Sequence, residues 1–243
     1  MSRYLLFLAG TALLRATTIL AIWEPMAVTV GVDSRITRHT AQGDSYSDEC
    51  KLWNSGSYYF TATGILNDGA GFNVHSLSLE AAKKGGSIAD VAARFKVLAE
   101  AALPGVTSRI NRLDPTLFTP EKPYLELIVF GFENGSAAIS ALSFHQEFDH
   151  PTRLESGAVD WNSPKDLPPG EDAGFFSMGD HTRMDRYMDA LPDWSIGQPR
   201  ETTIRQMIQL EVKDNPNVGG PISLLQVDSS GAHWFDTGVC HVP

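Results

Sequence analysis

Two neighbouring threonines near the start of the chain raise the question of a nucleophile. Thr17 and Thr18 follow an apolar leader and open a short apolar segment, and a second apolar segment ends with Asp33, two residues before Arg35. Thr17 is either an ordinary strand residue or a buried nucleophile that becomes a chain terminus. The second role depends on removal of the residues that precede it.

The first sixteen residues are expected to be a leader. Ser2 and Arg3 give a weakly basic start, residues 4–14 form an apolar run, and Arg15 and Ala16 follow. The run is too short to span a bilayer as a helix, but it fits a compact signal peptide that is cleaved after Ala16. A self-removed propeptide and a misassigned start are the alternatives. The signal-peptide interpretation predicts an exported or periplasmic protein, and the alternatives predict a cytoplasmic one.

Composition and charge limit the classes of function. The chain has 243 residues, 42% of them hydrophobic, and a formal net charge of −10. The hydrophobic content is typical of a globular core, and we expect residues 17–243 to form a single domain behind the leader, residues 1–16. The acidic balance argues against nucleic-acid binding, which requires a basic face.

Cysteine and histidine form no metal-binding pattern. Cys50 and Cys240 are the two cysteines of the chain, and they cannot bind a metal cluster by themselves. Two free buried thiols are one interpretation, and one disulfide is the other if the chain is exported. His145 and His150 lie five positions apart, which fits neither one helix face nor one strand face. We therefore expect no metal site.

The apolar segments arrive as strand pairs. Residues 18–23 and 27–33 are rich in β-branched residues and almost continuously apolar, which favours strands covered on both faces. Further strands are expected at 51–54 with 58–65, near 124–132 with 137–144 around an Asn-Gly turn, at 173–179, and in a closing hairpin over 221–238. The polar segments 34–49 and 149–172 are expected to be a loop and a connector with room for a short strand.

Four helices are expected between these strands, within 68–83, from Ser87 to about Arg112, and at about 180–190 and 200–213. Asp90 lies three residues after Ser87, as in a capping box, and an apolar stripe follows at Ile88, Val91, Phe95, Leu98 and Ala102. Strands that arrive in hairpins argue against a parallel doubly wound sheet. We predict an α+β fold in which two antiparallel sheets stack face to face with helix pairs packed outside.

The spacing of residues between 17 and 37 is distinctive. Thr17 and Thr18 are followed by aliphatic residues, and Asp33 lies sixteen positions after Thr17. Asp33 opens an Asp-Ser-Arg-x-Thr string whose last residue is Thr37. One such match carries little weight by itself, so its meaning depends on the rest of the chain.

Further motifs follow at consistent places. Lys51 opens the third predicted strand, the strand after it ends at Gly64, and a Gly-Gly pair at 219–220 leads into the closing hairpin. Together with the segment 17–37, this set resembles the proteasome β-type subunits and their bacterial relatives, which are N-terminal-nucleophile (Ntn) hydrolases. The resemblance covers nearly the whole chain from residue 17. It implies a four-layer αββα sandwich of two antiparallel sheets flanked by helix pairs.

The resemblance implies a threonine-type Ntn hydrolase that cleaves amide bonds, chiefly in peptides, once Thr17 is exposed. A threonine hydroxyl needs a base, and the freed α-amino group of Thr17, with a pKa of roughly 7.7–8.0, would accept its proton. Lys51 would keep the site electropositive, and Asp33 would fix the position of Lys51. The backbone N–H of Gly64 would donate to the oxyanion, and Thr37 would help to hold an extended peptide.

Several positions depart from the family pattern. Family members commonly have a Gly-Ser-Gly run where this chain has residues 177–180, so Met178 replaces a hydroxyl near the terminal amine. Asn215 and Val218 stand where an Asp and a Ser are frequent, and Ala16 precedes the nucleophile in place of the Gly of self-processing members. These departures suggest an alternative, a catalytically impaired proteasome-like subunit that serves assembly or binding.

The resemblance also implies partners. Family members stack into rings, so we expect a homo-oligomeric ring that takes a peptide or a small amide as its substrate. No cofactor, metal or nucleic acid is expected, and no membrane association after removal of the leader. If the apolar N-terminus is retained, an exported and anchored scaffold domain is a third interpretation.

Overall fold

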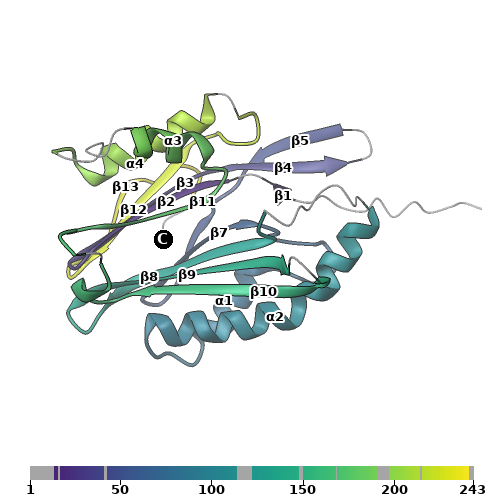
Figure 1. Cartoon of the computed structure of the whole chain (residues 1–243), viewed down its shortest axis with the longest axis horizontal. Coiled ribbons are helices and arrows are strands. Elements are labelled where there is room, and N and C mark those ends of the chain that lie inside the picture. Colours follow the sequence, from purple (N-terminus) through teal and green to yellow (C-terminus); the bar gives the residue numbers. More distant parts are fainter. Residues whose placement is uncertain are drawn as a thin grey trace, which may run out of the picture.

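The fold is built from antiparallel sheets and helices. The computed structural model describes residues 14–15, 17–40, 43–113, 122–147, 150–167, 169–190, 197–213 and 215–240. The described part contains three antiparallel sheets and four α-helices, which confirms the predicted α+β class (Figure 1). None of the helices within these ranges is long and apolar enough to cross a membrane.

One large sheet has the strand order β10-β9-β8-β7-β6, and its neighbouring strands are antiparallel. Its strands are β6 (Leu52–Ser55), β7 (Tyr58–Gly64), β8 (Leu125–Glu133), β9 (Ser136–Glu147) and β10 (His150–Trp161). The predicted Asn-Gly turn joins β8 to β9, where Asn134 and Gly135 both have positive φ. Such a pair matches the twist of a tight hairpin, so the prediction is confirmed.

The second large sheet has the order β11-β2-β3-β12-β13 and is also antiparallel. Its strands are β2 (Thr18–Glu24), β3 (Ala27–Asp33), β11 (Gly174–Gly179), β12 (Ile222–Asp228) and β13 (Gly231–Asp236). β2 and β3 lie in the interior of the sheet and are almost completely buried. Their near-continuous apolarity predicted this burial.

A small third sheet stands beside the two large ones, in the order β1-β4-β5. It consists of β1 (Leu14–Arg15), β4 (Arg35–Thr40) and β5 (Gly43–Asp48). The prediction of a loop over residues 34–49 is therefore wrong. These strands are too polar to show an apolar alternation, because they project from the main core (Figure 1). The remainder of the predicted leader, residues 1–13 and Ala16, lies outside the described residues.

The helices agree with the prediction, and their bounds are α1 (Val74–Ala82), α2 (Ile88–Leu113), α3 (Thr182–Ala190) and α4 (Arg200–Val212), with a short 3₁₀ helix η1 (Pro164–Asp166). Ser87 and Asp90 cap α2 reciprocally. The Asp90 carboxylate accepts the Ser87 N–H at 2.9 Å, and the Ser87 hydroxyl accepts the Asp90 N–H at 3.1 Å. This is the predicted capping box.

Three apolar clusters hold these elements together. One lies between α1, α2 and the β6–β10 sheet, and it includes Phe95 and Phe144. A second lies between the two large sheets and includes Ile19 and Phe130. The third joins the other large sheet to α3 and α4. The two large sheets therefore face each other, and each carries helices on its outer face (Figure 1).

The segment 149–172 also differs from the prediction. The sequence suggested a polar connector with a short strand at most, but β10 runs for 12 residues from His150 to Trp161 and pairs with β9, with a register shift between His150 and Leu154. β10 is an edge strand, and its residues from 155 to 160 are mainly exposed. An edge strand that is exposed to solvent tolerates a polar sequence. The hydropathy of residues 150–161 therefore did not indicate the full length of β10.

Candidate active site

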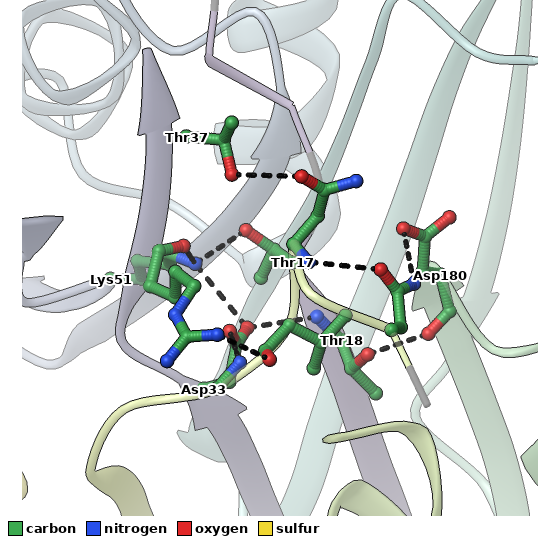
Figure 2. Close-up of polar contacts among 11 residues, drawn as sticks. Thr17, Thr18, Asp33, Thr37, Lys51 and Asp180 are labelled. Carbon is green, nitrogen blue, oxygen red and sulfur yellow. Dashed lines mark hydrogen bonds and ion pairs between the residues drawn. The ribbon is translucent and has the colours of Figure 1, made fainter. Parts of the chain in front are cut away.

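Thr17 lies immediately before β2, and its side chain meets a lysine that precedes β6. Thr17 is only 4% exposed. The Lys51 amine nitrogen lies 2.6 Å from the Thr17 hydroxyl oxygen (Figure 2). The β2–β3 hairpin and the start of β6 therefore bring the predicted nucleophile and the predicted lysine into direct contact.

Lys51 has three oxygen partners. Its Nζ lies 2.6 Å from the Thr17 hydroxyl, 3.3 Å from an Asp33 carboxylate oxygen and 2.5 Å from the backbone carbonyl of Arg35. An ammonium group has three N–H donors, so these contacts satisfy a charged lysine. A neutral amine has two N–H donors and one lone pair, and in that state Lys51 can accept the proton of Thr17. The same geometry suits both protonation states.

Asp33 ends β3 and is completely buried. One carboxylate oxygen accepts the backbone N–H of Thr18 at 2.9 Å, and the other accepts the N–H of Gly219 at 2.9 Å. Burial raises the pKa of Asp33, while Lys51 and the two N–H groups lower it. Burial likewise lowers the pKa of Lys51, against the opposing field of Asp33. The lysine thus releases its proton more readily than a lysine in water does.

The end of β11 holds the backbone of Thr17 in place. The Asp180 N–H donates to the Thr17 carbonyl at 2.9 Å, and the Thr18 hydroxyl donates to the Asp180 carbonyl at 2.6 Å. Gly179 has a φ of +78°, and a Cβ there would overlap the Thr17 carbonyl oxygen. Met178, the departure from the family pattern, is buried in the apolar cluster between the sheets. Met178 therefore contributes packing between the two large sheets.

A turn formed by residues 215–219 makes hydrogen bonds both to Asp180, just after β11, and to Thr37 in β4. The Asn215 side-chain amide donates to the Asp180 carboxylate at 2.9 Å, and its oxygen accepts the backbone N–H of Asn217 at 3.0 Å. The Thr37 hydroxyl donates to the side-chain oxygen of Asn217 at 3.3 Å. Figure 2 shows Thr37 and Asp180, the two ends of this chain of contacts, on either side of Thr17. Asn215 thus makes polar contacts with Asp180, which itself contacts Thr17, although the sequence marked Asn215 only as a departure from the family pattern.

Glu126 is a residue that sequence reasoning missed. It lies on β8, and its carboxylate accepts the N–H of Gly179 at 2.8 Å, which links the two large sheets beside the site. Burial raises the pKa of Glu126 to about 6, although the Gly179 N–H and the charge of His181 act in the opposite direction. The available signal was a single acid inside the apolar run YLELIVF, residues 124–130.

Gly64 ends β7 with a φ of +90°, and a Cβ there would overlap the Tyr124 carbonyl oxygen. Its neighbour Thr63 places its hydroxyl close to Gly179, which itself abuts Thr17. Gly64 therefore lies at the same end of the fold as Thr17. Among the described residues, no hydrogen bond joins Gly64 to Thr17.

The residues just before the nucleophile lie along β4. Leu14 is opposite Arg38, and Arg15 is opposite Thr37, in an antiparallel pair. β1 also contacts β7. The chain itself therefore supplies an extended segment beside Thr37, the residue that was expected to hold an extended peptide.

The two cysteines form a disulfide, which decides between the two interpretations of the sequence. Cys50 and Cys240 are bonded across 190 residues of chain. Cys50 directly precedes Lys51, and Cys240 lies after β13 near the C-terminus. The bond therefore ties the backbone next to Lys51 to the last part of the described chain.

The comparisons with known proteins assign no family. A scan against protein-family models finds no match, and no curated protein matches the chain. Over the residues that the structure describes, no group of three His, Cys, Asp or Glu side chains can hold a metal ion. What the site offers is a buried hydroxyl, a lysine of lowered pKa and a carboxylate, which together can activate a nucleophile.

Proposed function

We propose that the protein is a threonine-type Ntn hydrolase that cleaves amide bonds, chiefly peptide bonds, once Thr17 is exposed as a chain terminus. The observation that carries the proposal is the 2.6 Å contact between Lys51 Nζ and Thr17 Oγ1, with Asp33 beside the lysine. A hydroxyl becomes a nucleophile when a base takes its proton; the freed α-amine of Thr17 is the proposed base, and the contact with Lys51 stabilises the oxygen as that proton leaves. Two facing antiparallel sheets with outer helices support an αββα sandwich of the Ntn type.

In the proposed reaction, Thr17 Oγ attacks the carbonyl carbon of the scissile amide and forms a C–O bond. The hydroxyl proton passes to the free α-amine of Thr17 and then to the leaving nitrogen as the C–N bond breaks. Lys51 stabilises the oxygen through its contact, and the Gly64 N–H is the proposed donor to the oxyanion. Water then hydrolyses the ester and restores Thr17.

The pairing of β1 with β4 supports a peptide substrate. Residues 14–15 lie extended and antiparallel to the strand that carries Thr37. A peptide that adds to a strand edge gains backbone hydrogen bonds whatever its sequence. A small amide gains none of these contacts, so the peptide is the better substrate.

Intact mass and N-terminal sequencing of the purified chain test exposure of Thr17, and a fluorogenic peptide tests turnover. We expect a mature chain that begins at Thr17. Thr17→Ala should abolish turnover, and Thr17→Ser should retain part of it because serine keeps a hydroxyl. A chain that keeps residues 1–16, or unchanged turnover by the alanine variant, would overturn the proposal in favour of an inactive proteasome-like subunit.

Lys51→Met tests the activating contact. We expect kcat/KM to fall by about 100-fold or more, since the contact to Thr17 Oγ1 is lost. Lys84→Met, at an exposed lysine after α1, is the matched control and should leave turnover unchanged. Thermal melts of both variants separate loss of folding from loss of chemistry. A folded Lys51→Met variant with wild-type turnover contradicts the assigned role.

A further inference from the structure

We infer that Asn217 is a specificity residue that recognises the side chain two positions before the scissile bond, and that this position takes a hydrogen-bond acceptor such as glutamine. The inference rests on the proposed function, because it concerns the peptide that Thr17 would cleave. It follows from the position of Asn217 over β4 and from the register in which β1 pairs with that strand.

Contacts on β4 define which face is concerned. Arg35 and Thr37 are two residues apart in the strand, so their side chains lie on the same face. Tyr46 is opposite Thr37 in β5, and the Arg35 guanidinium lies 5.5 Å from the centre of the Tyr46 ring. Three side chains therefore share one face of the small sheet.

The turn 215–219 covers this face. Arg35 Nη1 donates to the Pro216 carbonyl at 2.8 Å and to the Val218 carbonyl at 3.2 Å. The Thr37 hydroxyl donates to the side-chain oxygen of Asn217 at 3.3 Å. Because these bonds hold both sides of the turn, the Asn217 side chain is fixed over Thr37.

The register of β1 identifies the substrate position. Arg15 is opposite Thr37, and it is the second residue before the bond that joins residue 16 to Thr17. Directly opposed residues of antiparallel strands have side chains on the same face, with Cβ atoms about 4.5–5.5 Å apart. A substrate peptide that binds in place of residues 14–15 has the same register. The residue two positions before its cleaved bond therefore lies opposite Thr37, on the face that Asn217 covers.

The free groups of Asn217 determine what it can recognise. Its side-chain oxygen accepts from Thr37, and its backbone N–H donates to Asn215. Within the described part of the chain its side-chain N–H₂ group makes no hydrogen bond, and the residue is partly exposed. Two free donors, with the Arg35 guanidinium on the same face, favour an acceptor over a cation.

The chain's own residue at this register is Arg15, which has no acceptor in its side chain. A tethered segment needs little affinity of its own, because its effective concentration is high. The mismatch predicts that the leader leaves this position readily after cleavage.

A panel of peptides tests the inference on the processed wild type. The substrates are acetyl-Leu-Xaa-Ala-aminomethylcoumarin with Xaa as glutamine, alanine or lysine. We expect kcat/KM for glutamine to exceed that for alanine by about tenfold, mainly through KM, and lysine to be the poorest. In Asn217→Ala, kcat/KM for the glutamine substrate should fall to the value for the alanine substrate. Asn54→Ala, at an exposed asparagine on β6, is the control and should change nothing.

Asn217→Asp separates recognition from a structural role. Aspartate keeps the oxygen that accepts from Thr37 but replaces the N–H₂ donors with a charge, so the preference should change from glutamine to lysine. If Asn217 only stabilised the turn 215–219, Asn217→Asp would not reverse the preference for glutamine over lysine. If the wild type cleaves all three peptides equally well, or if both Asn217 variants keep the wild-type preference for glutamine, the inference is wrong but the proposed function stands. If no peptide is cleaved, the proposed function fails, and the inference with it.

Discussion

Each polar side chain in the candidate site has a specific reason to be buried. Taking the charges of Lys51 and Asp33 out of water costs several kcal/mol for each ion. Their mutual contact and the N–H groups that bind the carboxylate offset only part of this cost, because burial remains the largest influence on the pKa of each group. Burial of two charges next to a hydroxyl is explained if the lysine takes part in activating Thr17, because functional sites often bury groups whose pKa is shifted.

Glu126→Gln is expected to change how stability depends on pH. Burial raises the pKa of Glu126 from 4.5 to about 6, so the folded chain binds more protons than the unfolded chain between these values. The wild type therefore loses stability as the pH rises from 4.5 through about 6. Glutamine keeps an acceptor for the Gly179 N–H without the charge. We expect the variant to exceed the wild type by about 1 kcal/mol at pH 7.

Urea denaturation at pH 4.5 and pH 7 measures this difference. Glu171→Gln, which removes one carboxylate at an exposed position, is the control for the change in net charge. An advantage of the Glu126 variant that does not grow between the two pH values would argue against the raised pKa.

At the scale of elements, the site lies where several strands end. β2 and β3 bring Thr17 and Asp33 together, β6 begins just after Lys51, and β11 ends against the Thr17 backbone. Strand ends place side chains and free N–H groups at one edge of a rigid scaffold. The close approach of β11 to Thr17 depends on Gly179, since a side chain does not fit there.

Gly179→Ala is expected to remove turnover. The new Cβ would overlap the Thr17 carbonyl oxygen, and the φ of +78° adds strain for any residue other than glycine. Gly135→Ala is the matched control, because Gly135 has a φ of +82° in the β8–β9 turn with open space around it. The control should lose about 1–2 kcal/mol of stability and keep its turnover. Equal turnover in the two variants would show that the approach of β11 is not needed.

The sequence predicted the elements whose pattern reflects the main core. Apolar runs revealed β2, β3 and β8, and the Ser87–Asp90 pair located the start of α2. β4, β5 and β10 were missed because their sequences are polar and carry no signal of burial.

The site was predictable in part for a similar reason. The spacing from Thr17 to Asp33 fits two adjoining strands, and the family resemblance added Lys51. Glu126 and Asn217 reach the site from distant parts of the chain, and their contacts depend on how the sheets and the turn pack. No local pattern encodes such packing.

At the scale of the whole molecule, the Cys50–Cys240 disulfide closes most of the chain into one loop. It joins the backbone beside Lys51 to the segment after β13, so it connects both large sheets covalently. A loop of 190 residues restricts the unfolded chain strongly. The bond therefore contributes to global stability and to the position of Lys51.

The double variant Cys50→Ser/Cys240→Ala is expected to lose about 3–5 kcal/mol of stability in urea denaturation. Reduction of the wild type by dithiothreitol should lower its urea midpoint to that of the double variant. The midpoint of the double variant should not change with the reductant. An unchanged midpoint in the reduced wild type would mean that the bond does not constrain the unfolded chain.

In the proposed mechanism, Thr17 provides both the hydroxyl nucleophile and the amine base. Reaction with a peptide epoxyketone, followed by mass mapping, tests it most directly, because this reagent can bond to both groups of an N-terminal threonine. We predict one adduct on the wild type, located on Thr17 as the first residue of the chain, and none on Thr17→Ala. A wild-type chain that does not react, or an adduct on another residue, would contradict the claim.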